Sequence, residues 1–117
     1  MITLITGVAG FIGFHEAIYE LKNGNRVIGV DNLNHYYDHQ LKISRLNILK
    51  KNKNFLFLKG DLSKSNFYNS IKKYYNQIEC IIHLAGQAGV RYSISNPEEY
   101  IKHNVAAYVK LLEFFKN

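Results

Sequence analysis

The 117-residue chain contains one cysteine, one proline and no long hydrophobic run. A single cysteine, Cys80, excludes a disulfide within the chain, and the apolar residues around it predict a buried free thiol. No stretch has the length and apolarity of a membrane span. The N-terminal run lacks a basic segment and is interrupted by glycines, His15 and Glu16, so it does not match a secretory signal. We therefore expect a cytoplasmic protein with no membrane partner.

Acidic residues are also few, with 9 Asp and Glu against 15 Lys and Arg, which gives a formal net charge of +6. The surplus lysines are scattered, as is typical of solvated surfaces: Lys50, Lys51, Lys53, Lys59, Lys64, Lys72 and Lys73. No nucleic-acid-binding motif accompanies them, so we expect no nucleic-acid partner, whereas an anionic ligand would be attracted. Repeats and linkers are absent, and the length predicts one domain over residues 1–117.

The first thirteen residues carry the most informative pattern. A β-branched run, Ile2–Thr6, predicts a buried strand, and three glycines follow it: Gly7, Gly10 and Gly13. A helical pattern then extends to about Asn23, with apolar residues at Phe11, Phe14, Ile18 and Leu21. Strand, glycine turn and helix form the arrangement that holds a dinucleotide pyrophosphate. The same spacing also fits an ordinary turn between a strand and a helix, so the motif needs support from elsewhere.

A second predicted strand, Arg26–Asp31, ends in an acid 18 positions after Gly13. In dinucleotide-binding folds, an acid about 20 residues beyond the glycines hydrogen-bonds the adenosine ribose. A carboxylate there favours NAD, because it repels the additional phosphate of NADP. The alternative is a solvent-facing turn residue, but the spacing favours ribose binding by Asp31.

The next segment is a polar and aromatic loop, from Asn32 to Asp38, that precedes a predicted helix ending near Lys50. Asp38 is placed to cap this helix. His35 and His39 lie four residues apart, but no third ligand is near in sequence, so they predict surface side chains rather than a metal site.

Two more strands are predicted, Phe55–Gly60 and Glu79–Leu84. Asp61 follows the first of them and admits two interpretations. It could contact an adenine at the carboxyl end of the sheet, or it could cap the next helix. The apolar face of that helix is predicted to comprise Phe67, Ile71 and Tyr74.

The long loop from Ala85 to Asn96 contains small residues at its start and Arg91, Tyr92 and Ser93 further on. Arg91 could bind a phosphate or carboxylate, or it could be an ordinary exposed arginine. A last helix is predicted to begin after Asn96, with Asn96 as cap and Glu99 at the capping-box position. Its predicted buried stripe comprises Ile101, Val105, Tyr108, Leu112 and Phe115. Asn104 falls beside this stripe and is either hydrogen-bonded internally or directed at the ligand crevice.

Four strands alternating with four helices predict an α/β fold with a parallel sheet. Right-handed crossovers and a switch point after the first strand predict the strand order 3-2-1-4 and a Rossmann-like sheet with flanking helices. The pattern stops after the fourth strand–helix unit, so we expect a truncated domain. Glu79–Leu84 would then be an apolar edge strand, for which we expect self-association or marginal stability.

Three segments together resemble the nucleotide-sugar epimerases among the extended short-chain dehydrogenases/reductases, most of all UDP-glucuronate 4-epimerases. These segments are Gly7–Gly13, Asp31–Asp38 with Leu41, Lys42 and Arg45, and His83–Ser93. The resemblance implies that NAD is the cofactor and that it is held in four places. The pyrophosphate would be held by Gly7, Gly10, Phe11, Ile12 and Gly13, the ribose by Asp31 and Asn32, the adenine by Asp61 and Leu62, and the nicotinamide side by Leu84, Ala85 and Gly86. It further implies that Asn104 supports the sheet end and that Arg91, Tyr92 and Ser93 lie near a nucleotide sugar, a UDP-hexuronate or UDP-hexose.

The catalytic groups of that family are missing from the sequence. The resemblance implies a Ser/Thr and a Tyr-x-x-x-Lys pair after the fourth helix, and the only match to the latter, Tyr68 to Lys72, lies before the fourth strand. We therefore expect no catalytic residue here and an NAD-binding N-terminal fragment of an epimerase, inactive alone. The alternatives are a stand-alone NAD-binding module without catalysis and a fragment of a nucleotide-sugar 4,6-dehydratase.

Overall fold

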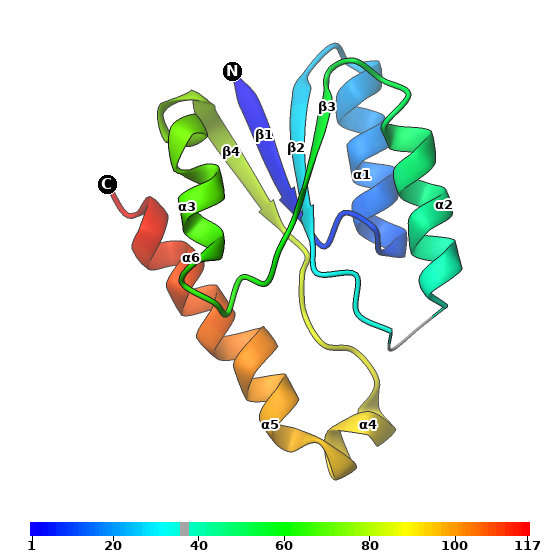
Figure 1. Ribbon diagram of the computed structural model, residues 1–117, viewed down its shortest axis with the longest axis vertical. Coiled ribbons are helices and arrows are strands. Elements are labelled where there is room, and N and C mark those ends of the chain that lie inside the picture. Colours follow the sequence, from blue (N-terminus) through cyan, green and yellow to red (C-terminus); the bar gives the residue numbers. More distant parts are fainter. Residues whose placement is uncertain (36–37) are drawn as a thin grey trace. The chain divides into compact units, whose positions relative to one another are not determined.

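The computed structural model describes residues 1–35 and 38–117 (Figure 1). Tyr36 and Tyr37, which belong to the predicted aromatic loop, lie outside the described residues. The chain divides into two compact units. The first comprises Met1–Gly60 and Asn76–Leu84, and the second comprises Asp61–Tyr75 and Ala85–Asn117.

The first unit is built on a four-stranded parallel sheet of order β3-β2-β1-β4. Its strands are β1 (Ile2–Thr6), β2 (Arg26–Asp31), β3 (Phe55–Lys59) and β4 (Ile78–His83). All five residues of β1 are buried, as expected for a central parallel strand covered on both faces. The predicted fold class and strand order are confirmed. β4 is an edge strand, and its pairing with β1 skips Glu79, which forms an irregularity in the ladder.

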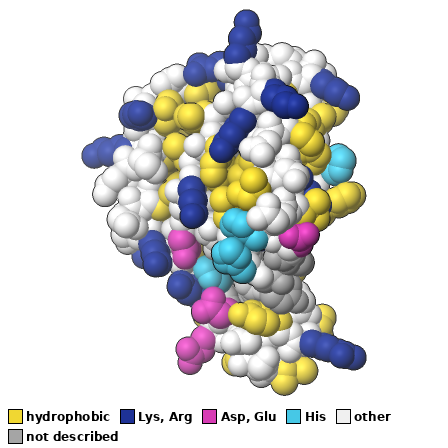
Figure 2. Space-filling view, turned by 45° about the vertical axis from the view of Figure 1, so that its right-hand side comes forward, with side chains coloured by type: hydrophobic (Ala, Val, Ile, Leu, Met, Phe, Trp, Pro, Cys, Tyr) yellow, Lys and Arg dark blue, Asp and Glu magenta, His cyan; other side chains and the backbone are white. Residues whose placement is uncertain are grey.

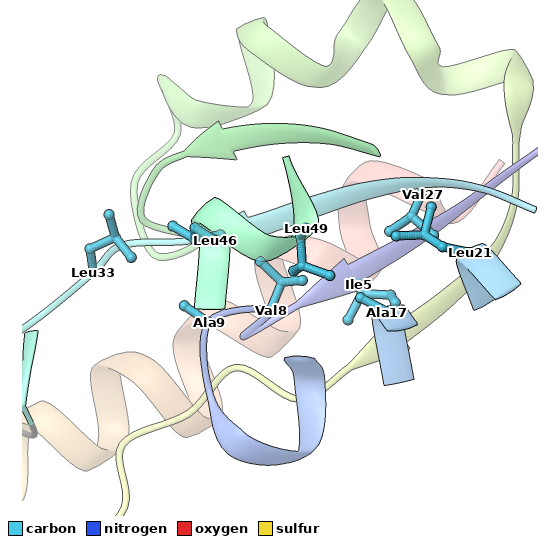
Figure 3. Packing of buried hydrophobic residues seen from close by; sticks show 9 residues of the cluster. All are labelled: Ile5, Val8, Ala9, Ala17, Leu21, Val27, Leu33, Leu46 and Leu49. Atoms are coloured by element: carbon cyan, nitrogen blue, oxygen red, sulfur yellow. The ribbon is translucent and has the colours of Figure 1, made fainter. Parts of the chain in front are cut away.

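Two helices complete the first unit, α1 (Phe11–Lys22) and α2 (His39–Leu49). α1 ends as predicted, because Gly24 adopts a φ of 82° and donates its N–H to the carbonyl of Leu21. α2 begins as predicted, because the Asp38 carboxylate accepts the N–H of Gln40 at 2.9 Å. Figure 3 shows the core formed by Ile5, Val8, Ala9, Ala17, Leu21, Val27, Leu33, Leu46 and Leu49.

The second unit is helical. It contains α3 (Phe67–Ile71), most of the 3₁₀-helix η1 (Lys72–Gln77), α4 (Val90–Ser95), α5 (Pro97–Tyr100), the π-helix η2 (Ile101–Ala106) and α6 (Ala107–Phe115). Aromatic rings from the two sequence segments of this unit pack against each other. The Tyr75 ring stacks on Phe115 at a centroid distance of 5.5 Å, and Tyr68 lies 5.1 Å from Phe114. In the described part of the chain, no helix is long and apolar enough to cross a membrane.

The predicted buried stripe of the last helix is wrong for four of its five members. Ile101, Val105, Tyr108 and Leu112 are exposed, and only Phe115 is partly covered. The buried positions are instead Ala107 and Leu111. Within the regular α-helix α6, Tyr108 and Leu112 are exposed, so the covered face is displaced from the predicted one.

Three smaller expectations are also corrected. Cys80 is exposed rather than buried, because edge strand β4 leaves part of its surface uncovered. Asn96 makes no capping hydrogen bond, and Glu99 faces His103 instead of completing a capping box. The helix with the predicted face Phe67, Ile71 and Tyr74 ends at Ile71, where the chain tightens into a 3₁₀-helix, and Tyr74 is only partly buried.

Candidate functional site

The glycine loop between β1 and α1 is closed by backbone contacts. Gly7, at a φ of 70°, and Val8 both donate N–H bonds to the carbonyl of Val30 on β2, at 2.8 and 3.2 Å. A Cβ on Gly13 would lie 2.1 Å from the carbonyl oxygen of Gly7, and one on Gly10 would lie 3.2 Å from the same atom. The three glycines therefore allow the loop and the start of α1 to approach each other closely.

The N-terminus of α1 is open to a ligand. The first N–H groups of a helix have no acceptor within the helix, and the cap residue Gly10 has no side chain to cover them. The first turn contains no acidic residue that would compensate the helix dipole. The side chains of Phe11 and Ile12 are mostly exposed, contrary to the expectation that Phe11 belongs to the apolar face of the helix. Such an end favours a bound anion.

Asp31 lies at the carboxyl end of β2, buried and hydrogen-bonded through both carboxylate oxygens. Oδ2 accepts the N–H of Ala9 at 3.0 Å, and Oδ1 accepts the N–H of Leu33 at 2.8 Å. The carboxylate is therefore fixed against the glycine loop, as the sequence spacing suggests. Leu33 adopts a φ of 56°, a conformation that costs free energy for a residue with a branched side chain. The adjacent Asn32 accepts the N–H of Asn34 and closes a second tight turn.

Two cations on α2 join this region, and sequence reasoning did not assign them to the site. Lys42 is 5% exposed and donates from Nζ to the carbonyl and side-chain oxygens of Asn34, at 3.0 and 2.9 Å. Burial lowers the pKa of Lys42, while the charge of Asp31 acts against this. Arg45 donates from Nη1 to the carbonyl of Ala9 at 2.9 Å. In the sequence, Lys42 and Arg45 stood out only as members of a segment that resembles epimerases.

The ends of β1 and β4 are joined by one side chain. Thr6 Oγ1 accepts the N–H of Leu84 at 3.0 Å and lies 2.7 Å from Nδ1 of His83. Burial lowers the pKa of the His83 imidazole. Leu84, the predicted nicotinamide-side residue, is thus held at the carboxyl end of the sheet by its backbone.

In the second unit, Asp61 begins the segment that follows β3. Its Oδ1 accepts hydrogen bonds from the backbone N–H and the hydroxyl of Ser63, at 2.9 and 2.6 Å. Burial alone would raise the pKa of Asp61, but the Ser63 hydrogen bonds and the charges of His103 and Lys102 lower it overall. The interpretation of Asp61 as a helix cap is wrong, because α3 begins only at Phe67, beyond the turn that Ser63 closes.

The loop after β4 is held by a helix of its own unit. Asn104 Oδ1 accepts the N–H of Gln87 at 2.6 Å, and its Nδ2 donates to the carbonyl of Gln87 at 3.1 Å. Tyr100, one turn earlier, donates from its hydroxyl to the carbonyls of Ala88 and Gly89. Asn104 is therefore satisfied internally and supports the loop directly after the sheet. Tyr100 and Gln87 were not identified from the sequence.

Gly86 lies against the same asparagine. A Cβ at Gly86 would lie 2.8 Å from Asn104 Oδ1, so an alanine would require this side chain to shift. Beyond Gly89 the predicted loop becomes α4, and Arg91 is exposed on it. Tyr92 and Ser93, the other two candidate substrate residues, are partly buried on the same helix.

The tyrosine and lysine of the Tyr68 to Lys72 match do not form a catalytic pair. The Tyr68 hydroxyl is buried and donates to the carbonyl of Leu62 at 2.9 Å. Burial and the nearby charge of Asp61 raise the pKa of Tyr68 to about 12. A tyrosine that acts as a base needs the opposite shift, so this residue is structural.

The described histidines do not form a metal site either. The rings of His35 and His39 stack at a centroid distance of 4.3 Å. In residues 1–35 and 38–117, no group of three or more His, Cys, Asp or Glu side chains could hold a metal ion.

The parallel 3-2-1-4 sheet with its glycine loop and terminal acid defines a Rossmann-like domain. The chain belongs to the family described as GDP-mannose 4,6 dehydratase, whose model matches residues 4–117. It is 46% identical over 114 residues to a UDP-glucuronate 4-epimerase of Thermodesulfobacterium geofontis, covering 97% of this chain and 35% of that relative. It is 43% identical over 115 residues to UDP-glucuronate 4-epimerase 6 of Arabidopsis thaliana, covering 97% of this chain and 24% of the relative.

A solved structure gives the same comparison in three dimensions. The UDP-glucuronic acid 4-epimerase of Bacillus cereus, crystallised with UDP-glucuronic acid and NAD, superposes with a TM-score of 0.89 at 32% identity. The match covers 100% of this chain and 37% of that protein. The chain thus spans from 24% to 37% of the length of these relatives.

Proposed function

We propose that this chain is the NAD-binding part of a nucleotide-sugar epimerase of the UDP-glucuronate 4-epimerase kind. The observation that carries the proposal is Asp31, whose carboxylate is fixed by the N–H of Ala9 within the glycine loop. This arrangement sets a ribose-binding acid beside an open helix N-terminus, which are the two elements that a dinucleotide requires. The cofactor, when bound, would accept a hydride from the sugar and return it.

The roles of individual residues form part of the proposal. The helix N-terminus and glycine loop would bind the pyrophosphate through Gly7, Gly10, Phe11, Ile12 and Gly13. Asp31 and Asn32 would bind the ribose, Asp61 and Leu62 the adenine, and Leu84, Ala85 and Gly86 the nicotinamide side, with Asn104 supporting the loop. Arg91, Tyr92 and Ser93 would contact a UDP-hexuronate or UDP-hexose. No residue of this chain is assigned to proton transfer, so we expect binding without turnover.

Two alternatives remain within reach of experiment. The family description favours a 4,6-dehydratase, whereas the identity to UDP-glucuronate 4-epimerases favours the epimerase. A stand-alone NAD-binding module is the second alternative.

We also propose a cytoplasmic location and a role in nucleotide-sugar metabolism for polysaccharide biosynthesis. Formation of an epimer when the purified chain is incubated with NAD and UDP-glucuronate would contradict the expectation that it is inactive alone.

The cofactor proposal is tested by calorimetric titration with NAD and NADP. We expect saturable binding of NAD with a preference over NADP. Asp31→Asn should weaken NAD binding by about tenfold, because a charge-assisted hydrogen bond is lost. It should also narrow the preference for NAD over NADP, because the repulsion of the extra phosphate of NADP is lost.

The matched control is Asp38→Asn, the same chemical change at the cap of α2, where asparagine is an equally good cap. This variant should bind both nucleotides as the unmodified chain does. A folded chain that binds neither nucleotide, or that binds NADP as tightly as NAD, would overturn the proposal.

A further inference from the structure

His103 lies between two carboxylates of the second unit. Its Nε2 is 3.1 Å from Oε2 of Glu99, one turn earlier, and its Nδ1 is 3.9 Å from Oδ1 of Asp61. The side chains of His103 and Asp61 are only 15% and 19% exposed, whereas Glu99 is more open. His103 belongs to the π-helix η2, a type of segment that is frequent at functional sites. The imidazole therefore bridges the helix and the segment that follows β3.

The protonation of the imidazole decides whether this bridge is complete. A neutral imidazole has one N–H donor and serves one carboxylate at a time, whereas an imidazolium has two donors. Only the charged form can donate to Glu99 and at the same time attract the Asp61 carboxylate, which lies at ion-pair distance from Nδ1. Histidine is the side chain whose charge ordinarily changes between about pH 5 and 8.

The carboxylate of Asp61 is held from one side only. Within the described residues, the contacts of this carboxylate with Ser63 and His103 all involve Oδ1. Oδ2 is left as an acceptor for a ligand N–H. The other ionisable groups that act here are Glu99, Lys102 and Tyr68, whose pKa is raised to about 12.

We propose that His103 is a positioning residue, which in its protonated form fixes Asp61 so that Oδ2 receives an N–H of an adenine base. This inference rests on the proposed function, in which Asp61 contacts the adenine of NAD. A fixed acceptor binds more tightly, because less side-chain freedom is lost when the ligand arrives. Adenine-containing ligands should therefore bind more tightly at pH 6 than at pH 8.

The test compares ligands with and without adenine across this pH range. The affinity of the unmodified chain for ADP-ribose should rise by about threefold to tenfold from pH 8 to pH 6, the range expected for fixing one side chain. His103→Gln keeps a polar side chain but does not titrate, and its ADP-ribose affinity should be flat. Nicotinamide mononucleotide lacks adenine, so His103→Gln should leave its pH profile unchanged.

Lys102→Met is the matched control. It removes another charge of the same helix that acts on Asp61, and it keeps the His103 imidazole. Lysine side chains ordinarily stay charged throughout this pH range. It should shift the ADP-ribose affinity equally at every pH and keep the slope. Circular dichroism verifies the fold of each variant, and Glu99→Gln, which removes one anchor of the bridge, should reduce the slope by an independent route.

The outcomes separate this inference from the proposed function. Binding of ADP-ribose with the same pH slope in the unmodified chain and in His103→Gln would overturn the inference and leave NAD binding intact. Absence of binding at every pH would overturn the proposed function and the adenine contact with it. Carbon NMR of the Asp61 carboxyl tests the coupling between Asp61 and His103 directly. The pKa of Asp61 should rise in His103→Gln, and an unchanged pKa would show that the two groups are not coupled.

Discussion

At the scale of single residues, the glycine loop is the most constrained part of the chain. Gly13 illustrates the constraint. A glycine is needed there because a side chain would not fit, and not because the dihedral angles are unusual. Its missing Cβ would come within 2.1 Å of the carbonyl oxygen and 2.9 Å of the carbonyl carbon of Gly7. These are backbone atoms, which have no alternative rotamer.

Gly13→Ala should therefore destabilise the chain by about 3 kcal/mol and abolish NAD binding, since α1 must move away from the loop. The sign is diagnostic, because the same change in an unconstrained helix stabilises by about 0.5–1 kcal/mol. Urea unfolding and NAD titration measure the two effects. Gly24→Ala is the control: open space surrounds it, and only its positive φ is strained, at a cost of about 1 kcal/mol. A Gly13→Ala variant that is as stable as the unmodified chain would contradict the packing role of Gly13.

At the residue level, the arrangement of the glycine loop and Asp31 could be predicted from the sequence, because it depends on spacing alone. Gly7, Gly10, Gly13 and Asp31 occupy fixed positions relative to a strand end, so their arrangement follows once the strand is recognised. Lys42 was not predicted as a site residue, because its proximity to Asn34 depends on how α2 returns to the loop. The individual cofactor contacts stay predictions for all of these residues.

At the scale of elements, the strands and the first two helices follow from local signals. Caps, glycines and apolar runs lie within a few residues of each boundary they determine. The last helix departs from its prediction, because the face that a helix buries depends on its neighbours, and large apolar side chains such as Tyr108 and Leu112 are exposed here. The same limit applies to Cys80, whose exposure depends on which strand lies at the edge of the sheet.

β4 is the element with a consequence for association. It is an edge strand of apolar character, and such an edge offers unpaired backbone groups to another chain. We expect the purified chain to form dimers or larger assemblies, seen by sedimentation velocity under reducing conditions. Cys80→Lys should shift it toward monomer, because a charge on an edge strand opposes pairing.

Cys80→Ser is the control for this substitution, since it removes the thiol without adding charge. It should associate as the unmodified chain does. A chain that sediments as a monomer at high concentration, or a Cys80→Lys variant that associates unchanged, would argue against pairing through β4.

At the scale of the whole molecule, the surplus of positively charged residues is scattered along the sequence. Figure 2 shows Lys and Arg side chains spread over the visible face and not gathered in one stripe. This agrees with the interpretation of the scattered lysines as a solvated surface.

The pH dependence of unfolding should report His83. Burial lowers its pKa in the folded chain, so the unfolded chain binds the proton more readily. Stability is therefore retained above about pH 6.5, the unfolded value, and decreases as the pH falls toward the folded value. Urea midpoints at pH 7.5 and 5.5 measure the loss, which should be smaller in His83→Gln. His15→Gln, at an exposed position, should leave the pH effect unchanged, and an equal loss in all three proteins would exclude His83 as its source.

The hydrogen bonds around Ala9 have a kinetic consequence. Its N–H is bound by Asp31 and its carbonyl by Arg45, so elements β2 and α2 both hold the backbone of this one residue of the glycine loop. A loop held in this way is ordered before any ligand arrives, and no slow rearrangement has to precede binding. The association rate is then set by the diffusion and orientation of the two molecules, and the positive charge of the chain increases it. Differences in affinity between variants should therefore lie mainly in the dissociation rate, which sets the lifetime of the complex.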